Sequence, residues 1–121
     1  PTRLSVRGDG TQEKPYLHVD DLLSAIERAL LEPADPIACF NIAGEGSTTV
    51  RAIAEMVRDE LGLRSATIEY GEDDRGWPGD VPRFRYDTRR IRALGWRPAR
   101  DSREAVRAAI RACVDECRRS S

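Results

Sequence analysis

Few side chains in this chain are of a type that carries out a reaction. The only histidine, His18, lies in "KPYLHV" at 14–19, where alternating strand-forming residues predict a β-strand, and a single histidine on a strand is typical of a structural role. The sequence has no GxSxG, HExxH or P-loop motif. The glycine pairs at 8–10 ("GDG") and 44–46 ("GEG") are too short for a dinucleotide fingerprint and predict turns. The residues therefore indicate neither a nucleophile nor a cofactor loop.

The acidic residues and the cysteines do not predict a metal site. Residues 72–74 ("EDD") precede no ligand pattern, so we interpret them as solvated charge. The cysteines are three in number and none has CxxC spacing. Cys113 and Cys117 share one helix face, which is a poor geometry for a disulfide and an incomplete one for zinc. We expect these two and Cys39 to be buried thiols in a reducing cytoplasm.

One loop has an unusual composition. Residues 73–96, "DDRGWPGDVPRFRYDTRRIRALGW", hold both tryptophans and six arginines. Arginine suits phosphate and carboxylate recognition because its donors form a fixed, bidentate fork, although an arginine-rich composition can also reflect a GC-rich genome. We expect Trp77 and Trp96 to be packing anchors. The loop is the best candidate for a binding segment.

Length and charge exclude several classes of protein. The chain has 121 residues, enough for one domain or part of one. Its 20 basic and 21 acidic residues give a net charge of −1, which argues against general nucleic-acid binding. No stretch is apolar enough to predict a membrane span, and no signal peptide is recognisable. The first residue is Pro1, which suggests that the chain begins partway through a longer protein.

Strands and helices alternate, which predicts an α/β fold. Residues 3–10 predict a short strand with a turn, and 14–19 and 66–70 predict two more. The apolar run "IACFNIA" at 37–43 predicts a strand covered on both faces, as in a parallel sheet. The few strands predicted here are not enough to cover it on both faces. The sequence therefore resembles the end of a larger protein that contains a β-sheet.

Helical spacing predicts four helices. The first takes Asp20 as its N-cap and stops before Pro33; the second follows capping hydroxyls at 47–49 and stops at Gly62. A brief third helix spans 88–94. The last helix is expected to start at Asp101 or Ser102, since Asp101 has capping-box spacing to Glu104. The expected core-facing residues are Val19, Leu22, Leu23, Ile26 and Leu30 on the first helix; Val50, Ile53, Ala54, Val57 and Leu61 on the second; and Val106, Ala109, Ile110, Cys113, Val114 and Cys117 on the last.

Four segments in order carry a family resemblance: "GDGTQEKPYLHVDDLLSAIERAL", "FNIAGEGSTTVRAIAEMV", "RGWPGDVPRFRYDTRRIRALGWRP" and "DSREAVRAAI". Together they resemble the C-terminal part of the NAD-dependent sugar-nucleotide epimerases and dehydratases, the extended short-chain dehydrogenase/reductases, in the manner of a UDP-glucose 4-epimerase. The resemblance covers almost the whole chain. It implies that residues 1–121 form one substrate-binding α/β portion with few short strands and about four helices, without the N-terminal Rossmann half.

The same resemblance implies that the 73–96 loop closes over the nucleotide half of a nucleotide sugar. Asp80 matches the family aspartate that binds ribose hydroxyls, and Lys14 matches a position, usually arginine, that faces the nucleotide. The arginine that grips the diphosphate usually stands three residues before the aspartate, where this chain has Trp77. Arg75 and Arg83 are the alternative candidates. The competing interpretation is an internal salt bridge of Arg75 and Asp80 that pins the loop, with Lys14 at a solvated strand end.

The family's catalytic parts are not found in this sequence. The resemblance implies a parent that uses NAD and a Tyr-x-x-x-Lys base, but no tyrosine here is followed four positions later by lysine. We therefore expect no catalytic residues, no metal, no NAD bound by this chain and no activity from it alone. A nucleotide sugar is the expected partner, bound weakly if at all.

A non-enzymatic module that associates with itself and keeps the scaffold without the site is the alternative function. A truncated sheet predicts an exposed apolar patch near 37–43 or on the 20–31 helix, large enough to drive self-association. Convergence of Lys14, Arg75 and Asp80 on an open pocket would favour nucleotide binding, whereas bonds among them would favour the module.

Overall fold

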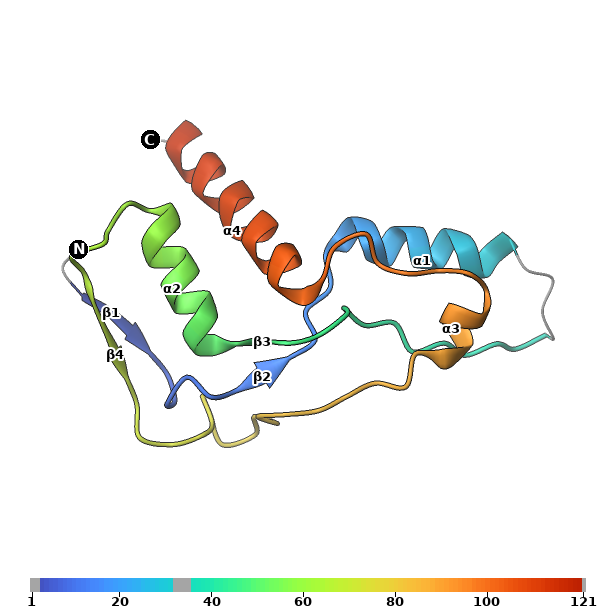
Figure 1. Cartoon of the computed structure of the whole chain (residues 1–121), viewed down its shortest axis with the longest axis horizontal. Helices are drawn as coiled ribbons and strands as arrows, with labels where there is room; N and C mark the ends of the chain where they lie inside the picture. The colour runs from blue at the N-terminus through green and yellow to red at the C-terminus, as the bar shows by residue number, and fades with distance from the viewer. Residues whose placement is uncertain (1–2, 32–35, 121) are drawn as a thin grey trace.

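The computed structural model describes residues 3–31 and 36–120 and confirms an α/β chain with short strands. Two small sheets and four helices follow one another along an elongated body (Figure 1). No helix in the described ranges is long and apolar enough to cross a membrane. The elements are β1 (Arg3–Val6), β2 (Glu13–Lys14), α1 (Val19–Leu31), β3 (Thr48–Thr49), α2 (Val50–Glu60), β4 (Thr67–Tyr70), α3 (Arg89–Ala93) and α4 (Ser102–Arg119).

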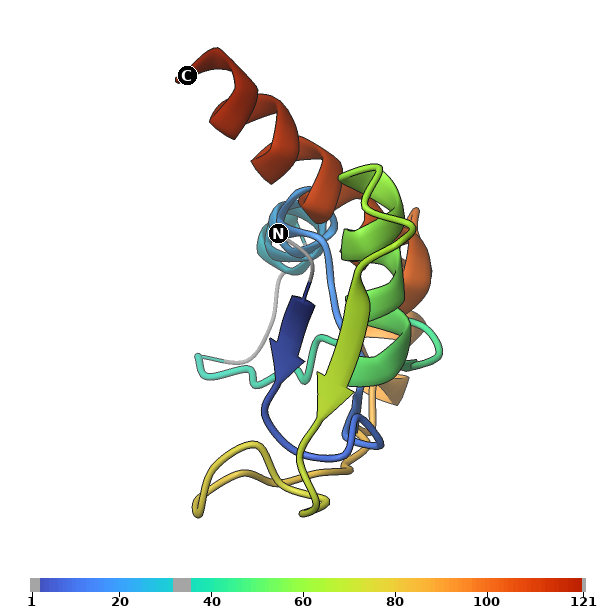
Figure 2. The same cartoon turned by 90° about the vertical axis from the view of Figure 1, so that its left-hand side faces the viewer.

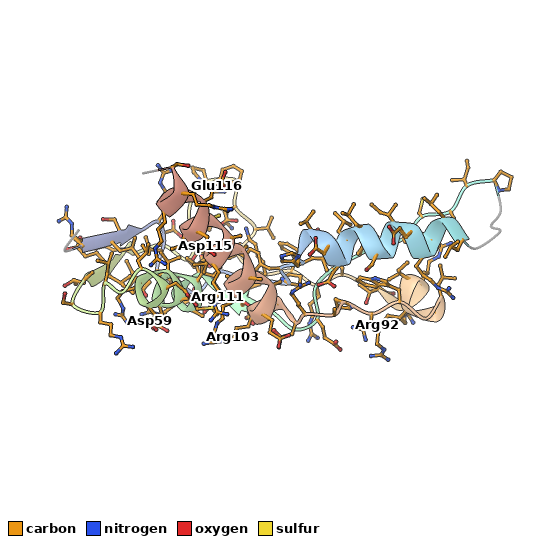
Figure 3. The ribbon with its side chains drawn as sticks, turned by 90° about the horizontal axis from the view of Figure 1, so that it is seen from above. Asp59, Arg92, Arg103, Arg111, Asp115 and Glu116 are labelled. Carbon is orange, nitrogen blue, oxygen red and sulfur yellow. The ribbon has the colours of Figure 1, made fainter. Side chains whose placement is uncertain are left out.

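The two sheets lie toward one end of the body. β1 pairs with β4 in parallel, with Arg3 opposite Thr67, and α2 lies beside this pair (Figure 2). β2 pairs with β3 antiparallel, with Lys14 opposite Thr48. Seen from above, α4 runs over α2 while α1 extends toward the other end (Figure 3), and Arg111 of α4 pairs with Glu60 of α2 at 2.9 Å.

Local capping signals correctly predicted both ends of α2 and the start of α4. The Thr49 hydroxyl accepts a hydrogen bond from the Ala52 amide at 3.1 Å at the start of α2. At α4, the Asp101 carboxylate accepts from the Glu104 amide at 2.8 Å, and the Glu104 carboxylate accepts from the Asp101 amide at 2.9 Å, completing the predicted capping box. Gly62 follows α2 with φ of +69°, a left-handed conformation that glycine adopts without strain.

One cluster of buried apolar residues lies between α1, α3 and the segment before α4. Ala25, Ile91 and Trp96 are buried together, and Trp96 also donates from Nε1 to the Ser24 hydroxyl at 2.9 Å. Trp96 is therefore the packing anchor that the sequence predicts. The partly buried residues packed against this cluster are Leu17, Ala29, Phe40, Ile42 and Leu94.

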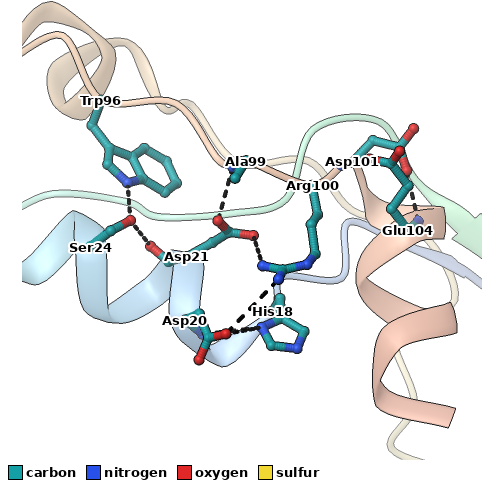
Figure 4. A network of polar contacts seen from close by, with 9 residues as sticks. All are labelled: His18, Asp20, Asp21, Ser24, Trp96, Ala99, Arg100, Asp101 and Glu104. Carbon is teal, nitrogen blue, oxygen red and sulfur yellow. Dashed lines mark hydrogen bonds and ion pairs between the residues drawn. The ribbon is translucent and has the colours of Figure 1, made fainter. Parts of the chain in front are cut away.

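A polar network joins α1 to the chain that leads into α4 (Figure 4). The buried Asp21 carboxylate accepts from the Ala99 amide at 2.9 Å and lies 3.7 Å from Arg100. His18 precedes α1, and its Nδ1 accepts from the Asp20 amide at 3.2 Å. These contacts agree with a structural role for His18.

The prediction of a strand at 14–19 is largely wrong. β2 ends at Lys14 because Pro15 has no amide to continue the ladder. α1 begins at Val19, so Asp20 lies in its first turn and is not its N-cap. The predicted stop before Pro33 falls at residues 32–35, outside the described ranges.

The predicted buried strand at 37–43 is also not formed. The segment has no strand assignment, most of it is exposed, and Ile37 is 84% exposed. No described strand lies beside it to accept its backbone hydrogen bonds. Only its last part reaches the core, through Phe40 and Ile42.

Several side chains expected inside are exposed. The predicted core-facing stripe of α1 faces outward, and the stripe of α4 is buried only near its start, around Val106, because α4 runs on beyond its neighbours (Figure 1). The α2 stripe is mostly buried or half-buried, as predicted.

Trp77 is 61% exposed, so it is not a packing anchor. The cysteines Cys39, Cys113 and Cys117 are all exposed, because they lie on the uncovered 37–43 segment and the uncovered part of α4.

Candidate functional site

The loop after β4 is attached to the turn and strand that precede α1. The Gly71 amide donates to the Gly8 carbonyl at 2.8 Å, the Asp9 amide to Asp73 at 2.7 Å, and the Glu13 amide to Pro82 at 2.8 Å. Gly8 has φ of +80°, and a Cβ there would lie 3.0 Å from the Arg75 carbonyl oxygen. A glycine is therefore needed where the loop and the turn approach each other.

Lys14 and Asp80 form the centre of the site. The Lys14 Nζ donates to the Asp80 Oδ1 at 2.8 Å, although the residues are 66 positions apart. The other carboxylate oxygen of Asp80 accepts from the Gly76 amide at 3.2 Å. The Asp80 side chain is only 8% exposed, whereas the Lys14 side chain is 31% exposed. The Asp80 carboxylate is thus held by the loop and by Lys14, and the Lys14 side chain remains partly exposed.

This contact favours the charged forms of both groups. The hydrogen bond from Lys14, with a smaller contribution from the Gly76 amide, holds the pKa of Asp80 below 3.8. The hydrogen bond to Asp80 raises the pKa of Lys14 above 10.5. Lys14 and Asp80 therefore form an ion pair across the neutral range.

The two candidate arginines do not join this pair. The Arg75 Nε lies 4.0 Å from the Asp74 carboxylate, and its side chain is half-exposed. The Arg83 Nη2 donates to the Thr11 carbonyl at 3.5 Å. The structure thus brings Lys14 and Asp80 together and leaves Arg75 and Arg83 apart. The internal salt bridge foreseen for Asp80 is present, with Lys14 in place of Arg75.

An open cavity of about 590 Å³ is lined by Glu13 and Pro15, on either side of Lys14 in the sequence, but Lys14, Arg75 and Asp80 do not line it. Arg83, Arg85 and Arg92 line it, and the Phe84 and Tyr86 rings meet edge to face at 5.2 Å between centroids. Apart from Arg83, these residues were not predicted as site residues, although the alternation "RFRY" at 83–86 could have indicated them. The other lining residues are Glu13, Pro15, Ala43, Gly44, Glu45, Gly46, Ser47 and Thr88.

The two glycine turns, at 8–10 and 44–46, do not have the form of a dinucleotide-binding turn. A dinucleotide turn links a strand directly to a helix whose amide groups face the phosphates. The turn at 8–10 leads to β2, and its Gly8 and Gly10 carbonyls bind the amides of Gly71 and Arg51. The turn at 44–46 leads to β3. Within the described ranges, no group of three or more His, Cys, Asp or Glu residues could hold a metal.

Several known proteins similar to this chain are named for nucleotide sugars. No protein-family model matches the chain. GDP-L-fucose synthase 1 of Arabidopsis thaliana is 30% identical over 105 residues, which are 84% of this chain and 30% of that protein. The putative UDP-glucose 4-epimerase of Methanocaldococcus jannaschii is 27% identical over 85% of this chain and 32% of its own length. 

Solved structures of nucleotide-sugar epimerases are also similar to this chain. A UDP-galactose 4-epimerase structure superimposes with a TM-score of 0.79 and 30% identity over 96% of this chain. The chain is homologous to the NAD-dependent sugar-nucleotide epimerases and dehydratases. It spans 36% of that epimerase and about a third of the relatives named above. A further homologue, MoeE5, was solved with UDP-glucuronic acid and NAD and superimposes with a TM-score of 0.74 at 26% identity.

Proposed function

We propose that residues 1–121 are the C-terminal, substrate-binding portion of an NAD-dependent nucleotide-sugar epimerase or dehydratase. One observation carries the proposal: the loop after β4 bonds to the turn and strand before α1 and so brings Asp80 and Lys14, the two residues that resemble the family's nucleotide-facing positions, to one place. The homology to enzymes named for UDP-, GDP- and dTDP-sugars supports it.

The two groups suit the two parts of a nucleoside diphosphate. A carboxylate can accept hydrogen bonds from two vicinal hydroxyls, so Asp80 is assigned to the ribose. The Lys14 ammonium is assigned to the diphosphate, as a point charge without the bidentate fork of arginine. Arg75 and Arg83 are exposed enough to turn toward the same anion. A bound nucleotide competes with the existing ion pair, so affinity should be weak.

The chain alone should have no catalytic activity. The proposal leaves the NAD site and the base of the reaction to another part of the parent enzyme. No described turn fits a dinucleotide, so no step of a reaction is assigned to this chain. Its contribution is to bind and orient the substrate.

Calorimetric titration with UDP, dTDP, GDP and UDP-glucose tests the proposal. We expect measurable heat for at least one nucleotide, with binding abolished by Asp80→Ala. Glu72→Ala is the matched control, since it removes the same charge from an exposed position on the same loop. Absence of heat from the unchanged chain at millimolar ligand, or binding that survives Asp80→Ala, would contradict the proposal.

A second candidate function is a non-enzymatic, self-associating module. The closure of Lys14 on Asp80 favours it, because the two candidate ligands satisfy each other. So do the large apolar side chains on the outer face of α1. Sedimentation over a range of concentrations tests this candidate: association that grows with concentration supports it, and a monomer throughout contradicts it.

A further inference from the structure

Ser102, the first residue of α4, lies at a buried junction of three segments and is only 1% exposed. Its amide donates to the Glu45 carbonyl at 2.8 Å, which attaches the start of α4 to the segment before β3. Its hydroxyl contacts Lys14 and Tyr16 at the end of β2 and Thr48 of β3. The helix does not need this hydroxyl as a cap, because the capping box already closes its first turn. The contacts of the hydroxyl therefore serve the two strands.

The Ser102 hydroxyl bonds to the backbone where β2 ends. Pro15 has no amide to continue the ladder, so β2 stops at Lys14. The Tyr16 amide donates to the Ser102 Oγ at 3.1 Å, and the Ser102 hydroxyl donates to the Lys14 carbonyl at 3.3 Å. The Tyr16 amide also donates to the Lys14 carbonyl at 3.1 Å, in a three-residue turn. One buried hydroxyl thus closes this turn and holds the chain on both sides of Pro15.

The Thr48 hydroxyl completes the hydrogen bonding of Ser102. The two hydroxyl oxygens lie 2.9 Å apart, and Thr48 is only 3% exposed. A serine oxygen can accept two hydrogen bonds and donate one. Since the Ser102 hydroxyl donates to Lys14 and accepts from the Tyr16 amide, Thr48 is the donor of the hydroxyl pair. All three hydrogen-bonding positions of the Ser102 oxygen are then used, and a buried group paired in this way is costly to displace.

Lys14 belongs both to this junction and to the candidate site. Its carbonyl accepts from Ser102, and its Nζ donates to the Asp80 carboxylate at 2.8 Å. A lysine side chain is a flexible four-carbon stem, so the place of its ammonium group depends on how firmly its backbone is held. The ladder of β2 with β3 contains only two residue pairs and holds that backbone weakly. The hydroxyl of Ser102 supplies the additional support.

We propose that Ser102 is a positioning residue of the nucleotide site: its hydroxyl ties the start of α4 to the backbone around Pro15 and thereby sets where the Lys14 ammonium lies. The inference rests on the proposed function for its effect on nucleotide affinity. Its effect on the contact between Lys14 and Asp80 is a property of the free chain and can be measured without a ligand.

The titration of Asp80 in the free chain tests the inference. The Lys14 hydrogen bond is the largest cause of the lowered pKa of Asp80, so Ser102→Ala should raise that pKa toward 3.8. The carbon NMR shift of the Asp80 carboxyl group, followed across the acid range, measures it. Ser24→Ala is the matched control, because it also removes a hydrogen-bonded serine hydroxyl but lies on α1. The control should leave the pKa of Asp80 unchanged.

A second variant carries the test if Ser102→Ala does not fold. Thr48→Val removes the donor to the Ser102 oxygen and keeps the bonds of Ser102 to the β2 backbone. It should raise the pKa of Asp80 by a smaller amount. An unchanged pKa of Asp80 in folded Ser102→Ala, or in folded Thr48→Val where Ser102→Ala does not fold, would overturn the inference. An equal rise in Ser24→Ala would overturn it too, because the effect would then be a general loosening of the fold.

Calorimetric titration with UDP then separates this inference from the proposed function. If the unchanged chain binds the nucleotide, Ser102→Ala should weaken binding at least about five-fold, although it removes no charge. Equal affinity in the two chains would overturn the positioning role and leave the proposed function standing. Absence of binding by the unchanged chain to any of the nucleotides would contradict the proposed function, and the titration of Asp80 would still decide whether Ser102 positions Lys14.

Discussion

The two ends of the molecule differ in how far their side chains and backbone groups find partners within the chain. At the β1–β4 end, the loop that carries Asp80 finds partners within the chain: its amides bond to the preceding turn and its carboxylate to Lys14. At the α1 end, a small core around Trp96 is well packed, yet the helix above it exposes a stripe of leucine and isoleucine. At the first end the loop is bonded within the chain, whereas at the second end only the inner face of α1 is packed. Substitutions should therefore act differently at the two ends.

The largest effect is expected from the tryptophan that joins α1 to α3. Trp96 is only 5% exposed, so Trp96→Ala removes a buried ring from the core. The substitution also removes the indole N–H that donates to the Ser24 hydroxyl. We expect a loss of about 3–5 kcal/mol in the free energy of unfolding. Urea denaturation followed by circular dichroism measures it.

Trp77→Ala provides the comparison at the other end. Trp77 is 61% exposed, so its removal should change the free energy of unfolding by no more than about 0.5 kcal/mol. Equal losses for the two tryptophans would contradict the burial of Trp96 against Ala25 and Ile91.

The next effect concerns the buried carboxylate of Asp21, in the first turn of α1. Asp21→Ala leaves the Ala99 amide without its acceptor and removes the contact with Arg100. We expect a loss of about 1–3 kcal/mol, since the amide is left unsatisfied next to the core. Asp20→Ala, one residue away and exposed, should cost much less. A larger effect at Asp20 in the same denaturation experiment would show that the network does not hold α1.

Features set by neighbouring residues could be predicted from the sequence. Thr49, Asp101 and Gly62 act within one helical turn, so their roles follow from the order of residue types. The same holds for the strand at 66–70, where β4 forms. Helix number and approximate position were predicted for this reason.

Features that depend on distant partners could not be predicted. The spacing of the α1 stripe shows that its residues share a face, but not that the face points away from the core. The segment 37–43 has strand-forming residues, but a strand also needs a neighbour. Lys14 and Asp80 were each named as candidates, and only the fold shows that they bond to each other. Trp77 and Trp96 differ in burial because α3 and α1 enclose only the second.

A smaller effect is expected at the start of α4. Asp101→Ala removes the acceptor for the Glu104 amide and half of the capping box. We expect a loss of about 1 kcal/mol. Arg103→Ala, exposed in the same turn, is the control and should be near neutral. If both variants unfold at the same urea concentration as the unchanged chain, the capping box does not stabilise the helix in solution.

The smallest effect should be the pH dependence of the Lys14–Asp80 pair. The pKa of Asp80 is lowered below 3.8 by the Lys14 hydrogen bond, so its contribution to stability is present above that value and is lost as the pH falls through the folded-state pKa. The pKa of Lys14 is raised above 10.5, so its contribution is present below that value and is lost as the pH rises beyond it. The stability lost in Asp80→Asn should thus be constant from about pH 5 to about pH 9 and shrink on the acid side.

A double-mutant cycle separates this pair from the other acidic groups. Asp87 also has a lowered pKa, about 2, because Arg89 donates to it, so acid denaturation of the unchanged chain reports on more than one carboxylate. Measuring Asp80→Asn both in the unchanged chain and in Lys14→Gln cancels the contribution of Asp87, which is common to both backgrounds. The acid-side change should be smaller in the Lys14→Gln background, because the hydrogen bond that most lowers the Asp80 pKa is then absent. An identical pH dependence in the two backgrounds would mean that Lys14 does not pair with Asp80 in solution, and the loop would then present a free carboxylate to a ligand.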